Sequence, residues 1–230
     1  MDNAVSTSLA AIRSATFLSD AMMSPLVKFP ESTVAAGVAY CGSVEYYARL
    51  AAFGKIVFDI SRPFNRHDHE PRRCEIVGPS GRQTLSVPTH KPAGGKKASV
   101  ADLKVDFILD WRRVHWGAIF SAYGRSPFFE YYADRFRDVY ERHFDRLVDY
   151  DLALDALIRP ILGIKTEVGV VADRAELPNN DIPDVTVKPV EYYQVWAQRH
   201  GFQAGLSAID LVFNMGPESP LILAKMLELG

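Results

Sequence analysis

The fold is decided by the stretch TVAAGVAYCGSVEYYARLAAFGKIVFDI, which covers residues 33–60. Its first part, Thr33–Tyr40, is apolar and predicts a buried strand. After a short turn, Ser43 can cap a helix over Val44–Ala51, where apolar residues recur at helical spacing. The run Lys55–Ile60 predicts a second strand. A strand, a helix and a strand within this length form a βαβ unit, which predicts a parallel strand pair with a right-handed crossover.

The rest of the chain continues with a hairpin, helices and one further strand. The turn Gly78-Pro79-Ser80-Gly81 separates two β-rich runs, Arg73–Val77 and Gln83–Val87, and predicts a β-hairpin. Helices are predicted over Ile108–Tyr123, Ser126–Leu147 with Ser126 as the cap, Tyr150–Leu162, Tyr192–Arg199, Ser207–Asn214 with Ser207 and Asp210 in a capping box, and Pro220–Leu229, with a strand over Lys165–Val171 and a long surface loop over 173–189. We therefore predict an α/β fold with a Rossmann-like, mostly parallel sheet, an inserted β-hairpin and a helical C-terminal part.

Composition bounds the class of protein. The chain has 230 residues, of which 48% are hydrophobic and 23% charged, which excludes a disordered, collagen-like or disulfide-stapled protein. The formal net charge of −2 predicts no nucleic-acid partner, because no global basic field would hold a phosphate backbone. Two cysteines and the lack of a long unbroken apolar run predict a cytoplasmic protein without membrane insertion. We expect residues 1–30 to form a helical extension and residues 31–230 a single domain.

The most polar stretch is the loop Asn65–Arg73, which follows the second predicted strand. Open α/β sheets bind ligands at the carboxyl ends of their strands, so this loop is a candidate binding element. Guanidinium groups bind phosphate or carboxylate through paired hydrogen bonds, and the loop carries three of them, at Arg66, Arg72 and Arg73. His67 and His69 could ligate a metal, but no second cluster accompanies them, so no metal is predicted. The alternative is a solvated loop of mixed charge.

A second basic loop covers Lys91–Lys97 and contains two adjacent glycines. Backbone N–H groups beside glycine can nest an anion, and Lys91 and Lys96 would add positive charge. His90, just before the loop, is a candidate acid–base residue because the pKa of imidazole lies near neutrality. We expect this loop to lie within reach of Arg73. The alternative is a flexible connector without the spacing of a P-loop.

One predicted helix carries a histidine on an aromatic face. Trp111 and His115 share a stripe of the helix over Ile108–Tyr123, and Trp116 and Tyr123 lie nearby. His115 is a candidate general acid–base, and the aromatic rings could hold a sugar ring or a base. The alternative for all of them is ordinary core packing.

The standard enzyme motifs are absent from the sequence. Cys41 lies in a strand-to-helix turn, where a helix N-terminus lowers the pKa of a thiol, but nothing in the sequence pairs a histidine with it. The patterns GxSxG, HExxH, GxGxxG and CxxC do not occur. Motifs alone therefore assign no reaction.

Several blocks taken together resemble the WbqC-like proteins, particularly those of the Bacteroidetes. The blocks are Gln83–Pro88, Trp111–Trp116, Ser121–Tyr123, Ser126–Tyr132, Tyr192–Val195, His200–Phe202 and Leu206–Ser219. Their spacing also matches, and the likeness covers residues 33–225. The resemblance implies a role in surface polysaccharide (O-antigen) production, to which family members are linked by name and gene setting.

The resemblance also bears on the predicted site. The opening strand, turn and helix are similar to those of nucleotidyltransferase-type Rossmann-like folds, but the signature histidines of those enzymes are missing from the turn Tyr40–Ser43. In the basic loop, the family's last arginine carries over to Arg73, whereas His67 stands near the position of its lysine and Arg72 replaces its asparagine. The resemblance thus leaves nucleotide binding open and argues against nucleotidyl transfer.

Two functions remain open from the sequence. The first is an enzyme of surface polysaccharide biosynthesis that acts on a small molecule, an activated sugar such as a nucleotide sugar or an acyl donor, with no cofactor specified. The second is a non-catalytic binding or assembly protein. For the first function, we expect a groove lined by His115, Trp116, Tyr123 and Arg73. Asn214 and Glu218, between the last two helices, could add polar groups to the groove or serve only as caps.

Overall fold

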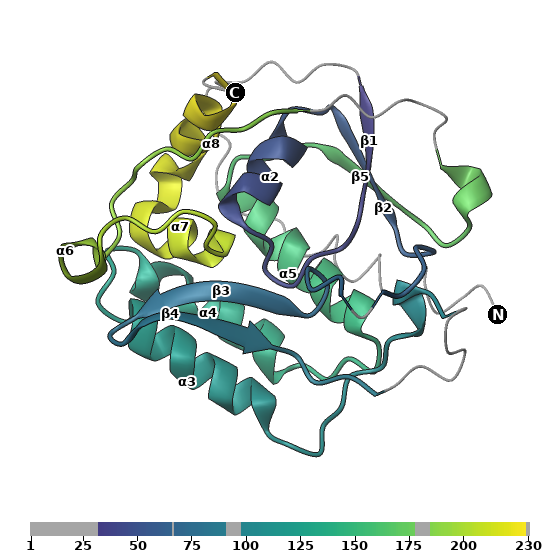
Figure 1. Cartoon of the computed structure of the whole chain (residues 1–230), viewed down its shortest axis with the longest axis horizontal. Helices are drawn as coiled ribbons and strands as arrows, with labels where there is room; N and C mark the ends of the chain where they lie inside the picture. Colours follow the sequence, from purple (N-terminus) through teal and green to yellow (C-terminus); the bar gives the residue numbers. More distant parts are fainter. Residues whose placement is uncertain (1–31, 66, 91–97, 178–184, 229–230) are drawn as a thin grey trace.

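The computed structural model describes residues 32–65, 67–90, 98–177 and 185–228, and it is an α/β structure with two separate sheets (Figure 1). The larger sheet has three parallel strands in the order β1 (Thr33–Ala36), β2 (Lys55–Asp59) and β5 (Glu167–Val171). The smaller sheet is an antiparallel hairpin of β3 (Arg73–Gly78) and β4 (Gly81–Ser86). The predicted fold class is therefore confirmed.

Helix α2 (Val44–Ala51) connects β1 to β2 and completes the predicted βαβ unit. Ser43 caps this helix as expected, because its hydroxyl accepts a hydrogen bond from a first-turn backbone N–H. The strand β1 ends at Ala36, four residues before the predicted end at Tyr40. The chain leaves the sheet there, and the Tyr40 N–H donates instead to the Glu70 carbonyl oxygen, 2.8 Å away in the loop after β2.

The hairpin has a tighter turn than predicted. Gly78 pairs with Gly81, so only Pro79 and Ser80 lie between the strands. Gly81 has a φ of 104°, a conformation that glycine adopts without steric cost. Figure 1 shows helix α3 running along the hairpin.

Four helical segments follow the hairpin, namely η2 (Val100–Asp102), α3 (Trp111–Tyr123), α4 (Phe129–Glu141) and α5 (Leu147–Ile161). Their bounds differ from the prediction for local reasons. Ile108 does not begin α3, because its N–H donates to the Asp106 carboxylate in a turn. Ser126 does not cap α4, because its hydroxyl donates to the Tyr123 carbonyl oxygen at 2.6 Å. Leu147, the predicted end of the second helix, instead begins α5.

The C-terminal part is helical, with η3 (Arg174–Glu176), α6 (Ala197–His200), α7 (Ala208–Met215), η4 (Gly216–Glu218) and α8 (Ser219–Glu228). Gly216 ends α7 as predicted. The helix predicted over Tyr192–Arg199 is wrong over most of its length, because α6 begins only at Ala197. The capping box is also wrong: the Asp210 carboxylate accepts the Tyr192 hydroxyl at 2.7 Å, and Ser207 caps α7 alone.

Helix α7 contacts elements from both the N-terminal and the C-terminal parts of the chain. It packs against α2, α3, α4, α5, α8 and β3, and its residues are buried except for the half-buried Met215. The hydrophobic core extends without a break from Val34 in β1 to Met226 in α8. The extension predicted over residues 1–30 lies outside the described residues.

Within the described segments, no helix is both long and apolar enough to cross a membrane.

Candidate functional site

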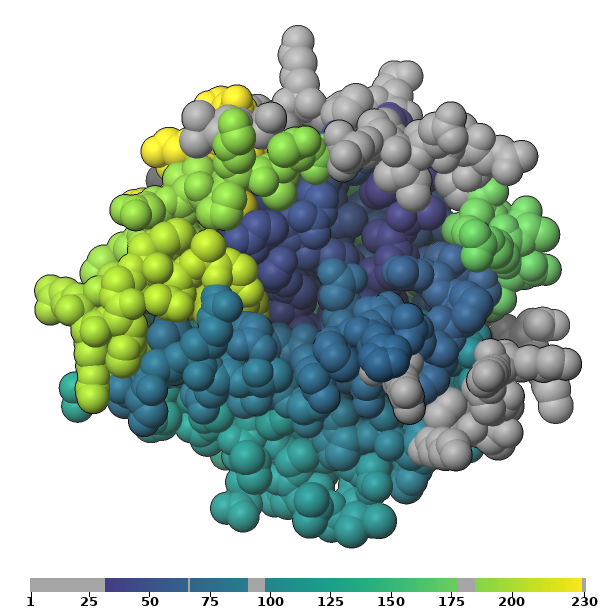
Figure 2. All heavy atoms as spheres, viewed as in Figure 1, coloured from purple at the N-terminus to yellow at the C-terminus, as the bar shows by residue number. Residues whose placement is uncertain are grey.

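A hollow lies where the parallel strands β1 and β2 end. Figure 2 shows the surface recessed over the purple and dark-blue atoms of β1, the β1–α2 turn and α2, between the blue atoms that follow β2 and the yellow-green atoms that precede α7. Two segments meet at this edge, residues 37–43 after β1 and residues 60–72 after β2. This is the edge at which open α/β sheets bind ligands, as the sequence predicted for the basic loop.

The N-terminus of α2 faces the chain itself. The Val44 N–H donates to the Leu206 carbonyl oxygen at 3.0 Å, and the Tyr46 N–H donates to the Ser43 hydroxyl at 3.0 Å. The turn before α2 is held as firmly, because the Ser207 hydroxyl donates to the Cys41 carbonyl oxygen at 2.6 Å. Dinucleotide-binding folds differ here, because they bind a pyrophosphate through helix N-terminal N–H groups that have no partner within the chain. The Val44 and Tyr46 N–H groups are already bonded to the chain itself and are therefore not available to an anion.

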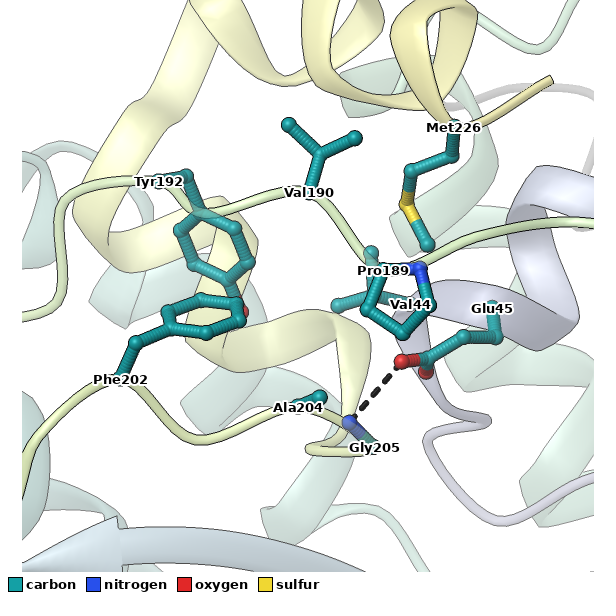
Figure 3. Close-up of a pocket in the computed structure, with 9 residues that line it drawn as sticks. All are labelled: Val44, Glu45, Pro189, Val190, Tyr192, Phe202, Ala204, Gly205 and Met226. Atoms are coloured by element: carbon teal, nitrogen blue, oxygen red, sulfur yellow. Dashed lines mark hydrogen bonds between the residues drawn. The ribbon is translucent and has the colours of Figure 1, made fainter. Parts of the chain in front are cut away.

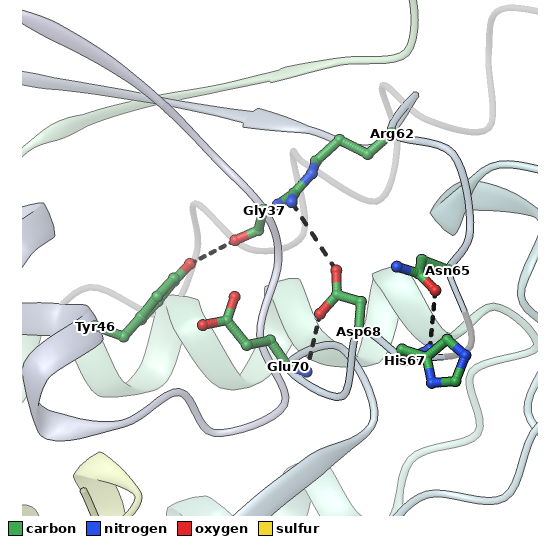
Figure 4. Close-up of polar contacts among 7 residues, drawn as sticks. All are labelled: Gly37, Tyr46, Arg62, Asn65, His67, Asp68 and Glu70. Atoms are coloured by element: carbon green, nitrogen blue, oxygen red, sulfur yellow. Dashed lines mark hydrogen bonds and ion pairs between the residues drawn. The ribbon is translucent and has the colours of Figure 1, made fainter.

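Arg62 supplies a cation at this edge. Its guanidinium group lies over Gly37, in the space that a Cβ atom would take, so the absence of a side chain there admits the arginine. Its ion pair with the Asp68 carboxylate is long, at 4.0 Å, and the Arg62 side chain keeps 45% of its exposure. Figure 4 shows Arg62, Asp68, Glu70 and Tyr46 grouped around Gly37. Among the described residues, this edge thus presents the guanidinium group of Arg62 and the carboxylates of Asp68 and Glu70.

Tyr46 connects the hollow to buried carboxyl groups on α5. Its hydroxyl donates to the Gly37 carbonyl oxygen at 2.8 Å. Burial raises the pKa of Tyr46 well above its ordinary value, and the carboxyl groups of Asp155 and Glu70 add to the rise. Tyr46 therefore stays protonated and acts as a hydrogen-bond donor.

Two buried aspartates of α5 differ in their partners. Asp155 pairs with Arg159 at 2.6 Å. Asp151 is 1% exposed, and neither of its carboxyl oxygens has a hydrogen-bond partner within the described part of the chain. Burial raises the pKa of Asp151 well above its ordinary value, and Cys41 and Asp155 add to the rise. Asp151 is thus a buried acid whose charged form is disfavoured by burial and whose hydrogen-bonding capacity is unused among the described residues.

His115 lies in the core. It is 5% exposed, and its Nδ1 atom is 2.7 Å from the Tyr40 hydroxyl, which is also 2.7 Å from the Tyr140 hydroxyl. Burial lowers the pKa of His115 to about 4, against the opposing effect of a hydrogen bond with the backbone of Ser86. The neutral ring then donates to Ser86 and accepts from Tyr40. This placement matches the alternative of a packed histidine, and the catalytic role of His115 stays a prediction.

The four residues of the predicted groove do not line one opening. His115 and Tyr123 are buried, whereas Arg73 is exposed at the start of β3. Trp116 is half-buried and stacks on Phe129 with ring centroids 6.1 Å apart. The prediction of a groove here was wrong because a helix packed under a hairpin buries the face that carries His115 and Tyr123.

The basic residues of the two predicted anion loops are only partly described. Arg66, Lys91 and Lys96 lie outside the described residues, so the expected proximity of Arg73 to the second loop stays a prediction. Arg72 lies over the ring of Phe64, 5.6 Å from its centroid. Burial, and to a lesser degree Arg73, lowers the pKa of Arg72.

The other predicted histidines are exposed. His90 lies 3.8 Å from the Asp106 carboxylate, and its acid–base role stays a prediction. His67 and His69 are exposed in the loop after β2. Among the described residues, no group of three or more His, Cys, Asp and Glu side chains could hold a metal ion.

Asn214 and Glu218 differ in their exposure to solvent. Asn214 is buried, donates to the Asp210 carbonyl oxygen at 2.8 Å and accepts from the Val195 N–H at 3.0 Å. Glu218 is exposed on η4. Asn214 therefore fastens the segment before α6 to α7, in keeping with a structural role, and a binding role for either residue stays a prediction.

A small cavity lies between the N-terminus of α2, helix α8 and the segments that precede α6 and α7 (Figure 3). Its volume of about 10 Å³ has room for roughly one water molecule. Its lining residues are Val44, Glu45, Pro189, Val190, Tyr192, Phe202, Ala204, Gly205 and Met226. One oxygen of Glu45 accepts the Gly205 N–H at 2.9 Å, and the other has no partner within the described residues. The cavity is too small for a substrate.

Sequence reasoning missed several residues of this region. Arg62 stands just before the predicted basic loop, and its approach to Gly37 depends on tertiary structure. The α5 aspartates did carry a signal, because Asp151 and Asp155 stand four residues apart on the stripe that also holds Leu154 and Ile158. Acids on the apolar stripe of a helix are expensive to bury and indicate a polar site or an ion pair.

Comparison with known proteins identifies a family. The model of the WbqC-like protein family matches residues 39–188, which include the β1–α2 turn, the loop after β2, the hairpin and helices α3 to α5. No curated protein sequence and no solved structure matches the chain. Because the matched range covers more than half of the sequence, the chain belongs to the WbqC-like protein family.

Proposed function

We propose that the protein is a cytoplasmic enzyme of surface polysaccharide biosynthesis that acts on an activated sugar or an acyl donor. The observation that carries this proposal is the polar hollow at the carboxyl ends of β1 and β2, into which Arg62 brings a guanidinium group with only a long ion pair to Asp68. A guanidinium group there can bind the phosphate of an activated donor. The assignment to surface polysaccharide biosynthesis comes from the resemblance to WbqC-like proteins.

A non-catalytic binding or assembly protein is the second candidate. It is favoured by the position of His115, which is buried and hydrogen-bonded to Tyr40. With that imidazole in the core, the charged groups that the structure places around Gly37 are the guanidinium group of Arg62 and the carboxylates of Asp68 and Glu70. The same hollow would then hold a ligand without transforming it.

Ligand binding tests the proposal first. We expect at least one member of a panel of nucleotide sugars, acyl-CoA and aminoacyl donors to raise the melting temperature, since a ligand at one hundred times its Kd adds about 2.7 kcal/mol to stability. Divalent metals are screened beside them. The Arg62→Gln variant should lose the shift, whereas Arg137→Gln, in an exposed ion pair on α4, should keep it.

Mass spectrometry then separates the two candidates. An enzyme converts the bound donor, with an added amine or hydroxyl acceptor, into a product of new mass. Binding without conversion over the acceptor panel would favour the binding protein. If no donor binds, the proposed function is wrong.

A further inference from the structure

Arg62 is placed to bind the anionic part of a ligand. Its side chain crosses from the loop after β2 to the end of β1, where Gly37 leaves room for it. The 4.0 Å separation from Asp68 exceeds the length of a hydrogen-bonded ion pair. The guanidinium group therefore keeps donors for a phosphate, which it can bind through two parallel hydrogen bonds.

Carboxylates stand beside that cation. Asp68 accepts the Glu70 N–H at 3.3 Å, which fixes the two residues next to each other in the loop. Figure 4 shows the Glu70 carboxylate between Asp68 and the Tyr46 ring, on the side of Gly37. No group of acidic, histidine and cysteine side chains among the described residues has an arrangement that could hold a metal. Carboxylates so placed suit an organic cation such as a protonated amine.

The interior beneath the same edge also has an unused polar group. Asp151 is buried near Cys41, which adds to the rise in the pKa of Asp151, and near Tyr46, whose pKa Asp151 helps to raise. Both carboxyl oxygens of Asp151 lack a hydrogen-bond partner among the described residues. A buried carboxyl group without a partner costs stability, so its presence needs a reason. A water bound inside the fold would provide one, because the buried Asp151 carboxyl group is out of reach of a ligand at the surface.

We propose that the hollow binds a phosphorylated sugar that carries a free amino group, with Arg62 at the phosphate and Glu70 and Asp68 at the ammonium group. This inference rests on the proposed function and narrows its substrate class from activated sugars in general to amino sugars. An amino group on the substrate is also the nucleophile that an acyl donor would need. The charges of the site and of the ligand are then complementary at both ends.

Four related sugars test the two charges separately. Glucosamine 1-phosphate carries both groups, N-acetylglucosamine 1-phosphate only the phosphate, glucosamine only the amine, and glucose neither. We expect the Kd of glucosamine 1-phosphate, measured by titration calorimetry, to be at least about tenfold lower than that of each of the others, because each charge-assisted contact contributes about a factor of ten or more.

Variants assign each charge to its residue. Arg62→Gln should weaken binding of both phosphorylated sugars about tenfold and leave glucosamine unchanged. Glu70→Gln should remove the preference for the free amine, so that the two phosphorylated sugars bind within about threefold of each other. Arg137→Gln and Glu141→Gln break an exposed ion pair on α4 and should change neither affinity.

The outcomes distinguish the inference from the proposed function. Equal binding of the amino and N-acetylated phosphates to the wild type overturns the amine assignment while the proposed function stands. Binding of a nucleotide sugar or acyl donor without any binding of the four sugars has the same consequence. If neither the four sugars nor any activated donor binds, both proposals are wrong.

Discussion

Two aspartates one turn apart on α5 differ in what their removal should do. Asp155 neutralises the half-buried Arg159, so Asp155→Ala leaves that cation without its partner and should lower the free energy of unfolding by about 3 kcal/mol. Asp151 has no partner among the described residues, so Asp151→Ala removes a desolvation cost and should raise it by about 1 to 2 kcal/mol. Urea unfolding at pH 7 measures both changes.

The comparison is controlled by position, since both substitutions place alanine on the same buried stripe of one helix. A loss of stability in Asp151→Ala as large as in Asp155→Ala would contradict the assignment of Asp151 as an unpartnered group. A stabilised Asp151→Ala variant that also binds ligand more weakly would show that the residue trades stability for function.

Single residues were predictable where a local rule decides their place. Ser43 and Gly216 follow from capping chemistry, and both serve as expected. His115 was ambiguous, because an aromatic helical stripe reads the same whether it faces a ligand or the core. Only the tertiary contact with Tyr40, 75 residues away in sequence, selects the core.

Two glycines show how an element depends on its surroundings. Gly216 ends α7 with a φ of 49°, and a Cβ atom there would lie 2.5 Å from the Phe128 ring, so Gly216→Ala should cost about 3 kcal/mol or more. Gly117 lies in the exposed middle of α3 with nothing within 4 Å of an added Cβ, so Gly117→Ala should stabilise by about 1 kcal/mol.

Thermal unfolding of the two variants beside the wild type measures the difference. The pair shares one chemical change, so their opposite signs would come from backbone conformation and packing alone. Equal melting temperatures for wild type and Gly216→Ala would contradict the conformation and the contact that the structure gives this turn.

Elements were predictable where the hydrophobic periodicity and the capping residues indicate the same boundaries. Helix α2 and strand β2 follow from the stretch 33–60, because a capping serine and a helical period mark the helix and an apolar run marks the strand, whereas β1 ends four residues earlier than predicted. The helix bounds between Ile108 and Leu162 were less well predicted. Side chains there make turn bonds, such as Ser126 to the Tyr123 carbonyl oxygen, that compete with helix caps and that spacing does not show.

At the scale of the whole molecule, the parallel sheet was predictable and the position of α7 was not. The βαβ pattern implies parallel pairing, which the structure confirms. Helix α7 is apolar on nearly every side, which indicates burial but not the partners that surround it. The hollow depends on those partners, since the segment before α7 bonds to the turn before α2 through Ser207 and Cys41. The candidate site therefore had to come from the tertiary structure.

Two buried groups in different parts of the core should oppose each other in the pH dependence of stability. Burial raises the pKa of Asp210 to about 6, against hydrogen bonds from Tyr192 and Gln194, so its contribution is present below about pH 4 and is lost as the pH rises through 6. Burial lowers the pKa of His115 to about 4, so its contribution is present above about pH 6.5 and is lost as the pH falls through 4.

Each variant should therefore change the slope of the unfolding free energy against pH between pH 4 and 6.5, and the two changes should have opposite signs. Relative to the wild type, Asp210→Asn should gain up to about 3 kcal/mol of unfolding free energy as the pH rises, and His115→Gln should lose a similar amount. The remaining titrating groups, Asp151 and Asp155 among them, are common to all three chains and cancel in the differences. Urea titrations at half-unit pH steps measure both slopes. Parallel curves would show that neither group changes its pKa on folding, whereas a loss of stability in His115→Gln at every pH measures the packing role of the ring apart from its charge.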